Sequence, residues 1–495
     1  MTTRAHPMAL IRAHLRGSLY APPKVLVPAR NSMVRVLGLR KMTAELWLVL
    51  AYIVVMGVGG LPAAKLGIHI GPAPIFLTDI TLMLLLAVSL VRCPARLLYW
   101  LSEGYGAGPV GRVVWILCIL ATLYFVLAFS EYGLYALRDL AIFAYSVFFP
   151  LTCFAIRDRR DAVRLLRYLT YAGVVLALML LFQIASGINI GPFEYKNTRL
   201  ILGHAVPEIG AGDGVVFSVF SLVALFAYFS FEPKLHLFHV MCAMVCLLAL
   251  AASTSRAGVV GVALAAGATF LCSTPKNRIR FALFAGFLAL LVFLSPLIPL
   301  FIPGARLLRG LRLSVLSAVI GGPSGDPTAA FRMIRWKITF ALWLTHPVLG
   351  VGFGRMLLPS TLHSLQAELG AGRFNMGMPH NTFLFLAARM GLVGLMAVLF
   401  CWFFILVHLF VVARRKRSAE ELAVANCLAA MFGVAMFGLF FERPELNGIF
   451  WIVMAIGQRL IACQAGVSPG RRQVSEVETK PQRRTGHGGF ERLTA

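Results

Sequence analysis

Three short stretches of this sequence place ionisable side chains inside strongly apolar surroundings. The first runs from Ser253 to Gly258, the second from Thr328 to Trp343, and the third begins at Pro379. An ionisable group at or near membrane depth costs a few kcal/mol, so such residues are functional candidates by default. The three stretches are therefore the candidates for a reactive or binding site.

The first stretch offers a cation at the start of a helix. Arg256 follows Ser255 and precedes Gly258, and the apolar run after it predicts a helix. A guanidinium at a helix N-terminus adds a bidentate donor to the positive end of the helix dipole, which suits a phosphate or pyrophosphate. The alternative is an interfacial arginine whose head reaches to water and anchors the helix.

The second stretch has helical spacing, with Arg332, Arg335 and Lys337 interrupting an apolar face. This pattern predicts a helix that lies along the membrane interface, and a solvated basic face is the alternative role for the arginines. A glycine-rich run follows at residues 346–354 and permits a tight turn and a close approach to a ligand. It is not a nucleotide fingerprint, because no predicted strand precedes it and no suitably spaced acidic residue follows.

The third stretch contains His380 and Asn381 at the mouth of an apolar run. A histidine there can titrate near neutral pH and act as a base or a hydrogen-bond donor, whereas the alternative is a polar cap for the helix. His346, His363 and His380 lack the spacing of metal ligands, and no pair of aspartates is separated by one residue. We expect no metal and no cofactor at this site.

The composition indicates that these candidate residues belong to a membrane protein. Of 495 residues, 59% are hydrophobic and 13% are charged, whereas soluble domains are about 25% charged. The formal net charge of +26 lies mostly between the apolar runs, with no nucleic-acid-binding motif, so we expect no nucleic-acid partner. The nine cysteines lack paired spacing and are interpreted as small apolar side chains.

Apolar runs of about 20 residues recur along the chain and predict an all-α bundle of about 12 transmembrane helices. The runs are continuously apolar, which favours helices over the alternating strands of a barrel. The predicted spans are residues 44–60, 74–91, 112–130, 137–156, 168–187, 213–230, 235–252, 256–273, 279–302, 380–413, 420–441 and 446–463.

The Lys and Arg residues set the expected orientation. The tail 1–43 is basic without an acidic residue, and basic residues recur in alternate loops, which places both termini in the cytoplasm. The bundle then covers residues 44–463, and residues 464–495 form a disordered cytoplasmic tail. The external loop 303–378 is long enough to carry function or to fold on its own. All three candidate stretches lie on this external face.

Taken together, the order of the motifs resembles the O-antigen ligase and O-antigen polymerase superfamily of bacterial inner-membrane glycosyltransferases. The motifs are S-x-S-R-x-G at 253–258, R-x-x-x-W at 332–336, H-P-x-x-G-x-G-x-G at 346–354, H-N-x-x-L at 380–384 and G-L-x-G at 391–394. The resemblance covers roughly residues 250–400. One departure is Arg389, since family members often have an acidic residue two positions before the glycine.

The resemblance implies a GT-C-like fold, a periplasmic active site and an undecaprenyl-pyrophosphate-linked glycan donor, without a metal. By motif position, Arg256 and Arg332 would grip the pyrophosphate, and His380 would activate the acceptor hydroxyl or stabilise charge at the transferred sugar. The expected supporting residues are Ser255, Arg335 and Asn381.

The expected acceptor is lipid A-core, which would make the chain an O-antigen ligase, or a growing glycan, which would make it an O-antigen or exopolysaccharide polymerase. The ligase is favoured because a single long late periplasmic loop is compatible with it. From another class, a transporter or a lipid-linked sugar flippase would also have about 12 spans with both ends inside. The candidate charges cluster at one face and not at mid-membrane, which counts against transport.

Overall fold

The computed structural model describes most of the chain after residue 41. The described ranges are 42–65, 67–70, 73–92, 94, 108–186, 195–201, 204–209, 214–231, 237–252, 255–294, 327–359 and 378–464. The expected tails and most of the loop 303–378 therefore lie outside the described residues. The architecture below is that of the described residues from Thr43 onward.

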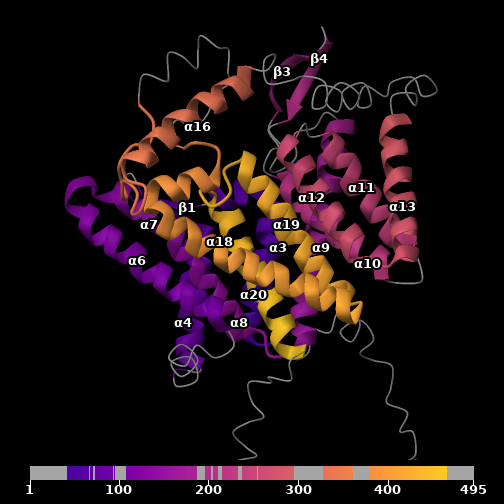
Figure 1. The fold of residues 1–495 in the computed structure, drawn as a ribbon, viewed down its shortest axis with the longest axis horizontal. Coiled ribbons are helices and arrows are strands. Elements are labelled where there is room, and N and C mark those ends of the chain that lie inside the picture. Colours follow the sequence, from indigo (N-terminus) through magenta and orange to yellow (C-terminus); the bar gives the residue numbers. More distant parts are fainter. Residues whose placement is uncertain are drawn as a thin grey trace, which may run out of the picture. The chain divides into compact units, whose positions relative to one another are not determined.

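Every predicted span overlaps a helix (Figure 1). The helices are α3 (Ala44–Lys65), α4 (Leu77–Arg92), α6 (Gly108–Tyr132), α7 (Leu134–Ala144), the 3₁₀ turn η2 (Tyr145–Val147), α8 (Phe148–Ala155), α9 (Arg159–Ser186), α10 (Gly214–Phe231), α11 (Leu237–Ala252), α12 (Arg256–Cys272), α13 (Pro275–Leu294), α16 (Pro327–Thr345), α18 (Thr382–Lys416), α19 (Ala419–Phe437) and α20 (Pro444–Gln464).

Among the described residues, six helices are long and apolar enough to cross a membrane. They are Gly108–Tyr132, Leu134–Ala155, Arg159–Gln183, Thr382–Lys416, Ala419–Phe437 and Pro444–Cys463. The chain is thus a polytopic helical membrane protein, and the count of about 12 spans stays a prediction.

Two small antiparallel hairpins amend the expected all-α architecture. Strands β1 (Gly67–Ile70) and β2 (Ala73–Phe76) pair between α3 and α4, and β3 (Tyr195–Ile201) and β4 (His204–Ile209) pair between α9 and α10. A hairpin satisfies the backbone N–H and C=O groups of a connection that leaves the helical region. The apolar runs that predict helices carry no information about these connections.

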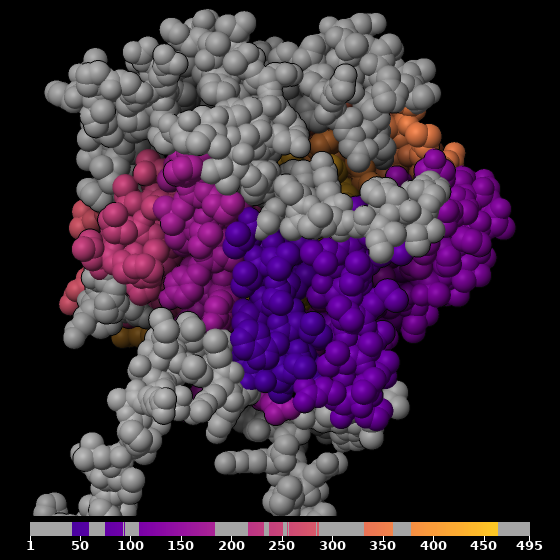
Figure 2. Space-filling model, turned by 180° about the vertical axis from the view of Figure 1, so that it is seen from behind, coloured from indigo at the N-terminus to yellow at the C-terminus, as the bar shows by residue number. Residues whose placement is uncertain are grey.

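The helix α19 lies at the centre of the bundle and packs closely against α12. A Cβ atom added at Gly261 would lie 2.8 Å from the carbonyl oxygen of Ala430, and one added at Gly433 would lie 2.9 Å from the Cα of Gly261. Small residues at such a crossing let two membrane helices approach to backbone contact. Seen from behind, α3 (indigo) lies between α6 (purple) and the magenta and pink helices (Figure 2).

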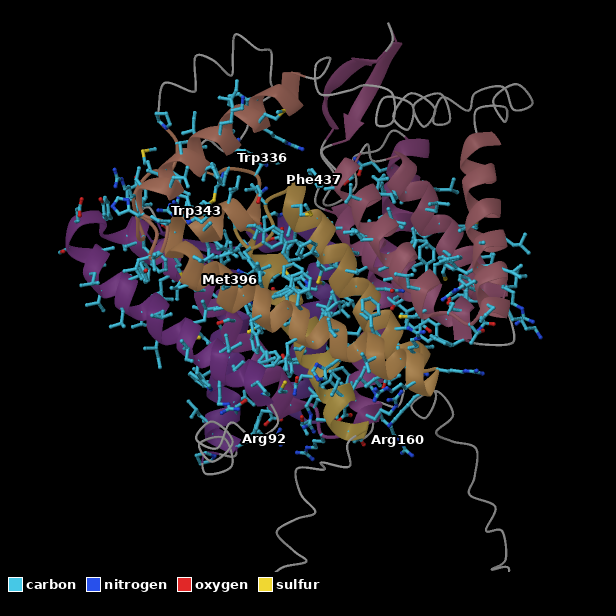
Figure 3. All side chains as sticks on the ribbon, viewed as in Figure 1. Arg92, Arg160, Trp336, Trp343, Met396 and Phe437 are labelled. Atoms are coloured by element: carbon cyan, nitrogen blue, oxygen red, sulfur yellow. The ribbon has the colours of Figure 1, made fainter. Side chains whose placement is uncertain are left out.

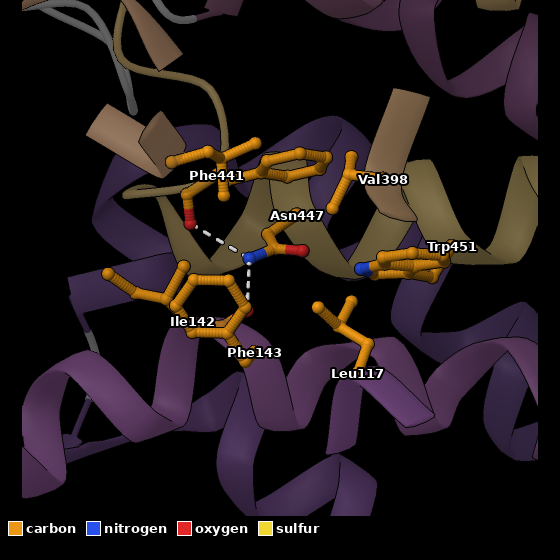
Figure 4. Close-up of a pocket in the computed structure, with 8 residues that line it drawn as sticks. Leu117, Ile142, Phe143, Val398, Phe441, Asn447 and Trp451 are labelled. Carbon is orange, nitrogen blue, oxygen red and sulfur yellow. Dashed lines mark hydrogen bonds between the residues drawn. The ribbon is translucent and has the colours of Figure 1, made fainter. Parts of the chain in front are cut away.

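The interior of the bundle is closed between α7, α18 and α20. Asn447 donates hydrogen bonds from Nδ2 to the carbonyl oxygens of Ile142, at 2.7 Å, and Phe441, at 2.8 Å (Figure 4). The cavity beside this amide measures about 10 Å³. A water needs about 10–15 Å³, so this cavity holds at most about one water and no substrate.

The basic loops and α16 lie at opposite ends of the bundle. Arg92 and Arg160 lie at one end, and Trp336 and Phe437 lie at the other (Figure 3). The charge pattern predicts that Arg92 and Arg160 face the cytoplasm. The candidate site therefore lies at the end that the sequence predicts to be external.

Candidate functional site

The helix α16 holds the chain immediately before His380. The indole Nε1 of Trp336 donates to the carbonyl oxygen of Pro379 at 2.9 Å, and the buried guanidinium of Arg335 donates to the carbonyl oxygen of Met378. The ring of Trp336 also lies 6.1 Å from that of Phe437, at the end of α19 (Figure 3). Hence α16, which was expected to be a helix along the membrane interface, serves as a scaffold for the histidine.

His380 and Asn381 have separate roles at the start of α18. Asn381 is the N-cap, because its Oδ1 accepts a hydrogen bond from the backbone N–H of Leu384 at 3.0 Å. His380 precedes the cap and has a φ of 56°, in the left-handed region that few residues other than glycine adopt. Such strained backbone persists where the surroundings fix it, and it is frequent at functional sites. The cap role proposed as the alternative for His380 therefore belongs to Asn381.

The surroundings of His380 keep its imidazole neutral. Burial, followed by the positive charges of Arg335 and Arg332, lowers the pKa of His380 to about 3. The expectation that His380 titrates near neutral pH is wrong, because the sequence revealed neither its burial nor the closeness of the two arginines. Burial and the nearby Arg332 lower the pKa of Arg335 to about 10, so this guanidinium stays charged at neutral pH.

The helix α12 brings Arg256 to the same end of the bundle. Ser255 is its N-cap and accepts a hydrogen bond from the backbone N–H of Gly258 at 3.2 Å, which makes Arg256 the first helical residue. The helices α12 and α19 are antiparallel and cross at Gly261. The N-terminal end of α12, at Arg256, therefore lies on the same side of the crossing as the C-terminal end of α19, at Phe437. The backbone of Arg256 therefore lies near the level of Phe437, while its side chain is outside the described residues.

The glycine-rich run packs on α18. The backbone N–H groups of Val351 and Gly352 donate to the carbonyl oxygens of Ala388, at 2.7 Å, and Arg389, at 3.1 Å. These two carbonyl groups are available because α18 is kinked at Gly391, whose φ is 63°, and the N–H groups of the next two residues donate outside the helix. A Cβ atom on Gly350 would lie 2.6 Å from the Ala388 carbonyl oxygen. Glycine at position 350 therefore allows a close approach to α18.

Arg389 is the centre of a buried polar network behind this loop. Its Nη2 lies 3.0 Å from the Oδ2 of Asp139 on α7, and both side chains are almost completely buried. Its Nη1 donates to the carbonyl oxygens of Gly352 and Arg355, while the N–H of Gly354 donates to Asp139 at 2.8 Å. Family members often have an acidic residue at the position of Arg389. Here the charge of the arginine is balanced by the buried carboxylate of Asp139.

Glu442, which belongs to none of the motifs, lies beside the histidine segment. Its Oε2 accepts hydrogen bonds from the Thr382 hydroxyl and the Phe440 N–H, both at 3.0 Å. Its Oε1 is buried and has no hydrogen-bond partner among the described residues. Burial raises the pKa of Glu442 to about 7. The sequence shows only that this acidic residue lies between two predicted spans. Its contact with Thr382 is visible only in the folded structure.

The structure thus gathers His380, Asn381, Arg332 and Arg335 at the junction of α16 and α18, with Glu442 beyond Thr382. In the described part of the chain, no three His, Cys, Asp or Glu side chains lie together in a way that could hold a metal ion. The arrangement offers cations for a polyanionic group and a neutral imidazole for a proton.

Comparison with known proteins gives one family. Residues 241–399 match the family model described as O-antigen ligase, which agrees with the resemblance drawn from the motifs. The match covers the stretch from α11 into α18 and includes Arg256, Arg332 and His380. No curated protein matches the chain.

Proposed function

Since residues 241–399 match the family model described as O-antigen ligase, we propose that this integral membrane protein transfers a glycan from undecaprenyl pyrophosphate to an acceptor sugar. The observation that carries the proposal is the junction of α16 and α18, where two arginines meet a strained, neutral histidine. The site lies on the periplasmic face of the bacterial inner membrane, with both termini in the cytoplasm.

The arginines bind the leaving group. Arg332 and Arg256 grip the pyrophosphate, and Arg335 keeps the His380 segment in place through the carbonyl of Met378. Pyrophosphate already stabilises negative charge as it leaves, and guanidinium groups in a water-poor site strengthen that stabilisation in the transition state. This division of labour needs neither a metal nor a cofactor.

His380 takes the proton of the acceptor hydroxyl once the donor is bound. Burial, together with the positive charges of Arg335 and Arg332, lowers the pKa of His380 to about 3, so its imidazole is a weak base. A bound pyrophosphate carries negative charge into the same place, offsets those two cations and raises the pKa of the histidine. Donor binding thereby activates the base, which limits proton abstraction to the complex in which the glycosyl bond is ready to break.

The favoured acceptor is lipid A-core, which makes the protein an O-antigen ligase. The alternative acceptor is a growing glycan, and the protein is then an O-antigen or exopolysaccharide polymerase. Membrane lipids surround the bundle in either case.

The test is the gel profile of lipopolysaccharide and lipid-linked glycan in a deletion strain complemented with wild type or His380→Ala. Bare lipid A-core with long polymer retained on undecaprenyl pyrophosphate supports the ligase, and core with a single repeat unit supports the O-antigen polymerase. An unchanged lipopolysaccharide pattern directs the search to exopolysaccharide. Full complementation by His380→Ala would remove the proposed role of the histidine.

A further inference from the structure

A second cavity lies far from the histidine, among α9, α10 and α11. Its volume is about 270 Å³, compared with about 10 Å³ for the cavity beside α20. Arg167, Tyr171, Tyr228, Phe238 and His239 contribute to its wall. This space is large enough for a phosphorylated headgroup, whereas the cavity beside α20 is not.

The lining of the cavity combines basic and aromatic side chains. Arg167 and His239 are its basic residues, and none of the described lining residues is acidic. The rings of Tyr228 and His239 stack with centroids 5.9 Å apart, and Tyr171 meets Phe238 edge to face at 6.4 Å. A wall of this kind complements a negatively charged group that is attached to an apolar chain.

The depth of the cavity matches the boundary between headgroups and acyl chains. Arg160 lies at the end of the bundle opposite Trp336 (Figure 3), and Arg167 follows about 10 Å further along α9 at 1.5 Å per residue. The charge pattern assigns this end to the cytoplasmic leaflet, which is rich in anionic lipids. A phosphodiester at this depth lies where the headgroups of that leaflet begin.

The rim of the cavity opens toward lipid. Leu237, Phe238 and Met241 project from α11 with exposed fractions of 75%, 60% and 56%, and Tyr171 on α9 is also exposed. In a membrane these apolar side chains contact acyl chains, since no other described helix covers them. A lipid whose headgroup fills the cavity can therefore leave its tails along this rim.

We propose that the cavity between α9, α10 and α11 binds one anionic phospholipid of the cytoplasmic leaflet, with its phosphodiester at Arg167 and an acyl chain along Phe238 and Met241. Basic pockets between membrane helices on the cytoplasmic side are a known mode of lipid recognition. The proposal concerns a site at the opposite end of the bundle from His380 and does not depend on the glycan chemistry.

The test is a titration of the purified full chain in neutral detergent, followed by native mass spectrometry. The probes are dioctanoyl phosphatidylglycerol, dioctanoyl phosphatidylcholine and inorganic phosphate. We expect phosphatidylglycerol to bind at least tenfold more tightly than phosphatidylcholine. Inorganic phosphate that displaces the lipid at equal concentration would overturn the lipid assignment in favour of a small-anion site.

Two variants and one control locate the binding. Arg167→Gln should weaken phosphatidylglycerol binding at least tenfold, whereas Arg160→Gln removes the same charge from a position of the same helix outside the cavity lining and should change it less than twofold. Cys242→Phe fills the cavity without changing its charge and should also weaken binding. Equal losses from Arg167→Gln and Arg160→Gln, or unchanged binding in Cys242→Phe, would overturn the proposal.

Discussion

The buried pair of Arg389 and Asp139 predicts a strong energetic coupling between α18 and α7. In Arg389→Met the carboxylate of Asp139 keeps only the Gly354 N–H and a distant contact with Arg138 at 3.5 Å. Removing one partner of a buried ion pair costs about 3–5 kcal/mol, because the other charge stays buried without compensation. Asp139→Asn should be similarly costly, because it leaves the Arg389 guanidinium buried.

The double variant Arg389→Met/Asp139→Asn should be much less destabilised than the sum of the two single variants. Its neutral amide can still accept the hydrogen bond from Gly354, and no buried charge remains. We expect a coupling free energy of at least about 2 kcal/mol.

The assay is equilibrium unfolding of the four proteins in mixed micelles of a mild detergent and dodecyl sulfate, followed by circular dichroism. Arg138→Met is the matched control, since it removes a neighbouring arginine that is 42% exposed, and it should leave the free energy of unfolding nearly unchanged. Additive effects of the two single variants, within about 0.5 kcal/mol, would refute the buried pair.

Three further outcomes follow from the site. The pH profile of kcat, which reports on the donor complex, should show a basic group with a higher pKa than the profile of kcat/KM, which reports on the free enzyme; identical profiles would contradict activation of His380 by the donor. Because the folded state raises the pKa of Glu442 from 4.5 to about 7, its contribution to stability is full below pH 4.5 and is lost as the pH rises through 7. In thermal unfolding, the stability of Glu442→Gln relative to wild type should therefore increase as the pH rises from 5 to about 8. A stability difference that does not change with pH would argue against a buried carboxyl. Trp336→Phe removes the hydrogen bond to Pro379 and should lower kcat more than it changes KM in a transfer assay, with a stability loss of about 1 kcal/mol; a change confined to KM would indicate a different role.

The sequence predicted the helical elements well, because apolar runs identify membrane helices directly. Each predicted span overlaps a helix, and the pattern at 328–343 predicted α16. The short hairpins were not predicted, since pairing between residues such as Gly67 and Phe76 leaves no periodic signal in so few residues.

The sequence supplied the candidate residues of the site, but it did not reveal their contacts. Motif order indicated His380 and Arg332, whereas the left-handed backbone of His380 depends on α16, which lies more than 30 residues earlier in the chain. Glu442 and the partner of Arg389 also come from distant segments. Spacing along the chain cannot reveal such long-range contacts, and the same limit explains why the depressed pKa of His380 was missed.

The central claim is tested most directly by glycan transfer in liposomes that contain the purified protein, an undecaprenyl-pyrophosphate-linked glycan and lipid A-core. Wild type should transfer the glycan in the presence of EDTA, and so should His346→Ala, which changes an exposed histidine nearby. His380→Ala should insert normally and transfer none. Undiminished transfer by His380→Ala, or a loss with EDTA that a divalent ion restores, would contradict the proposed mechanism.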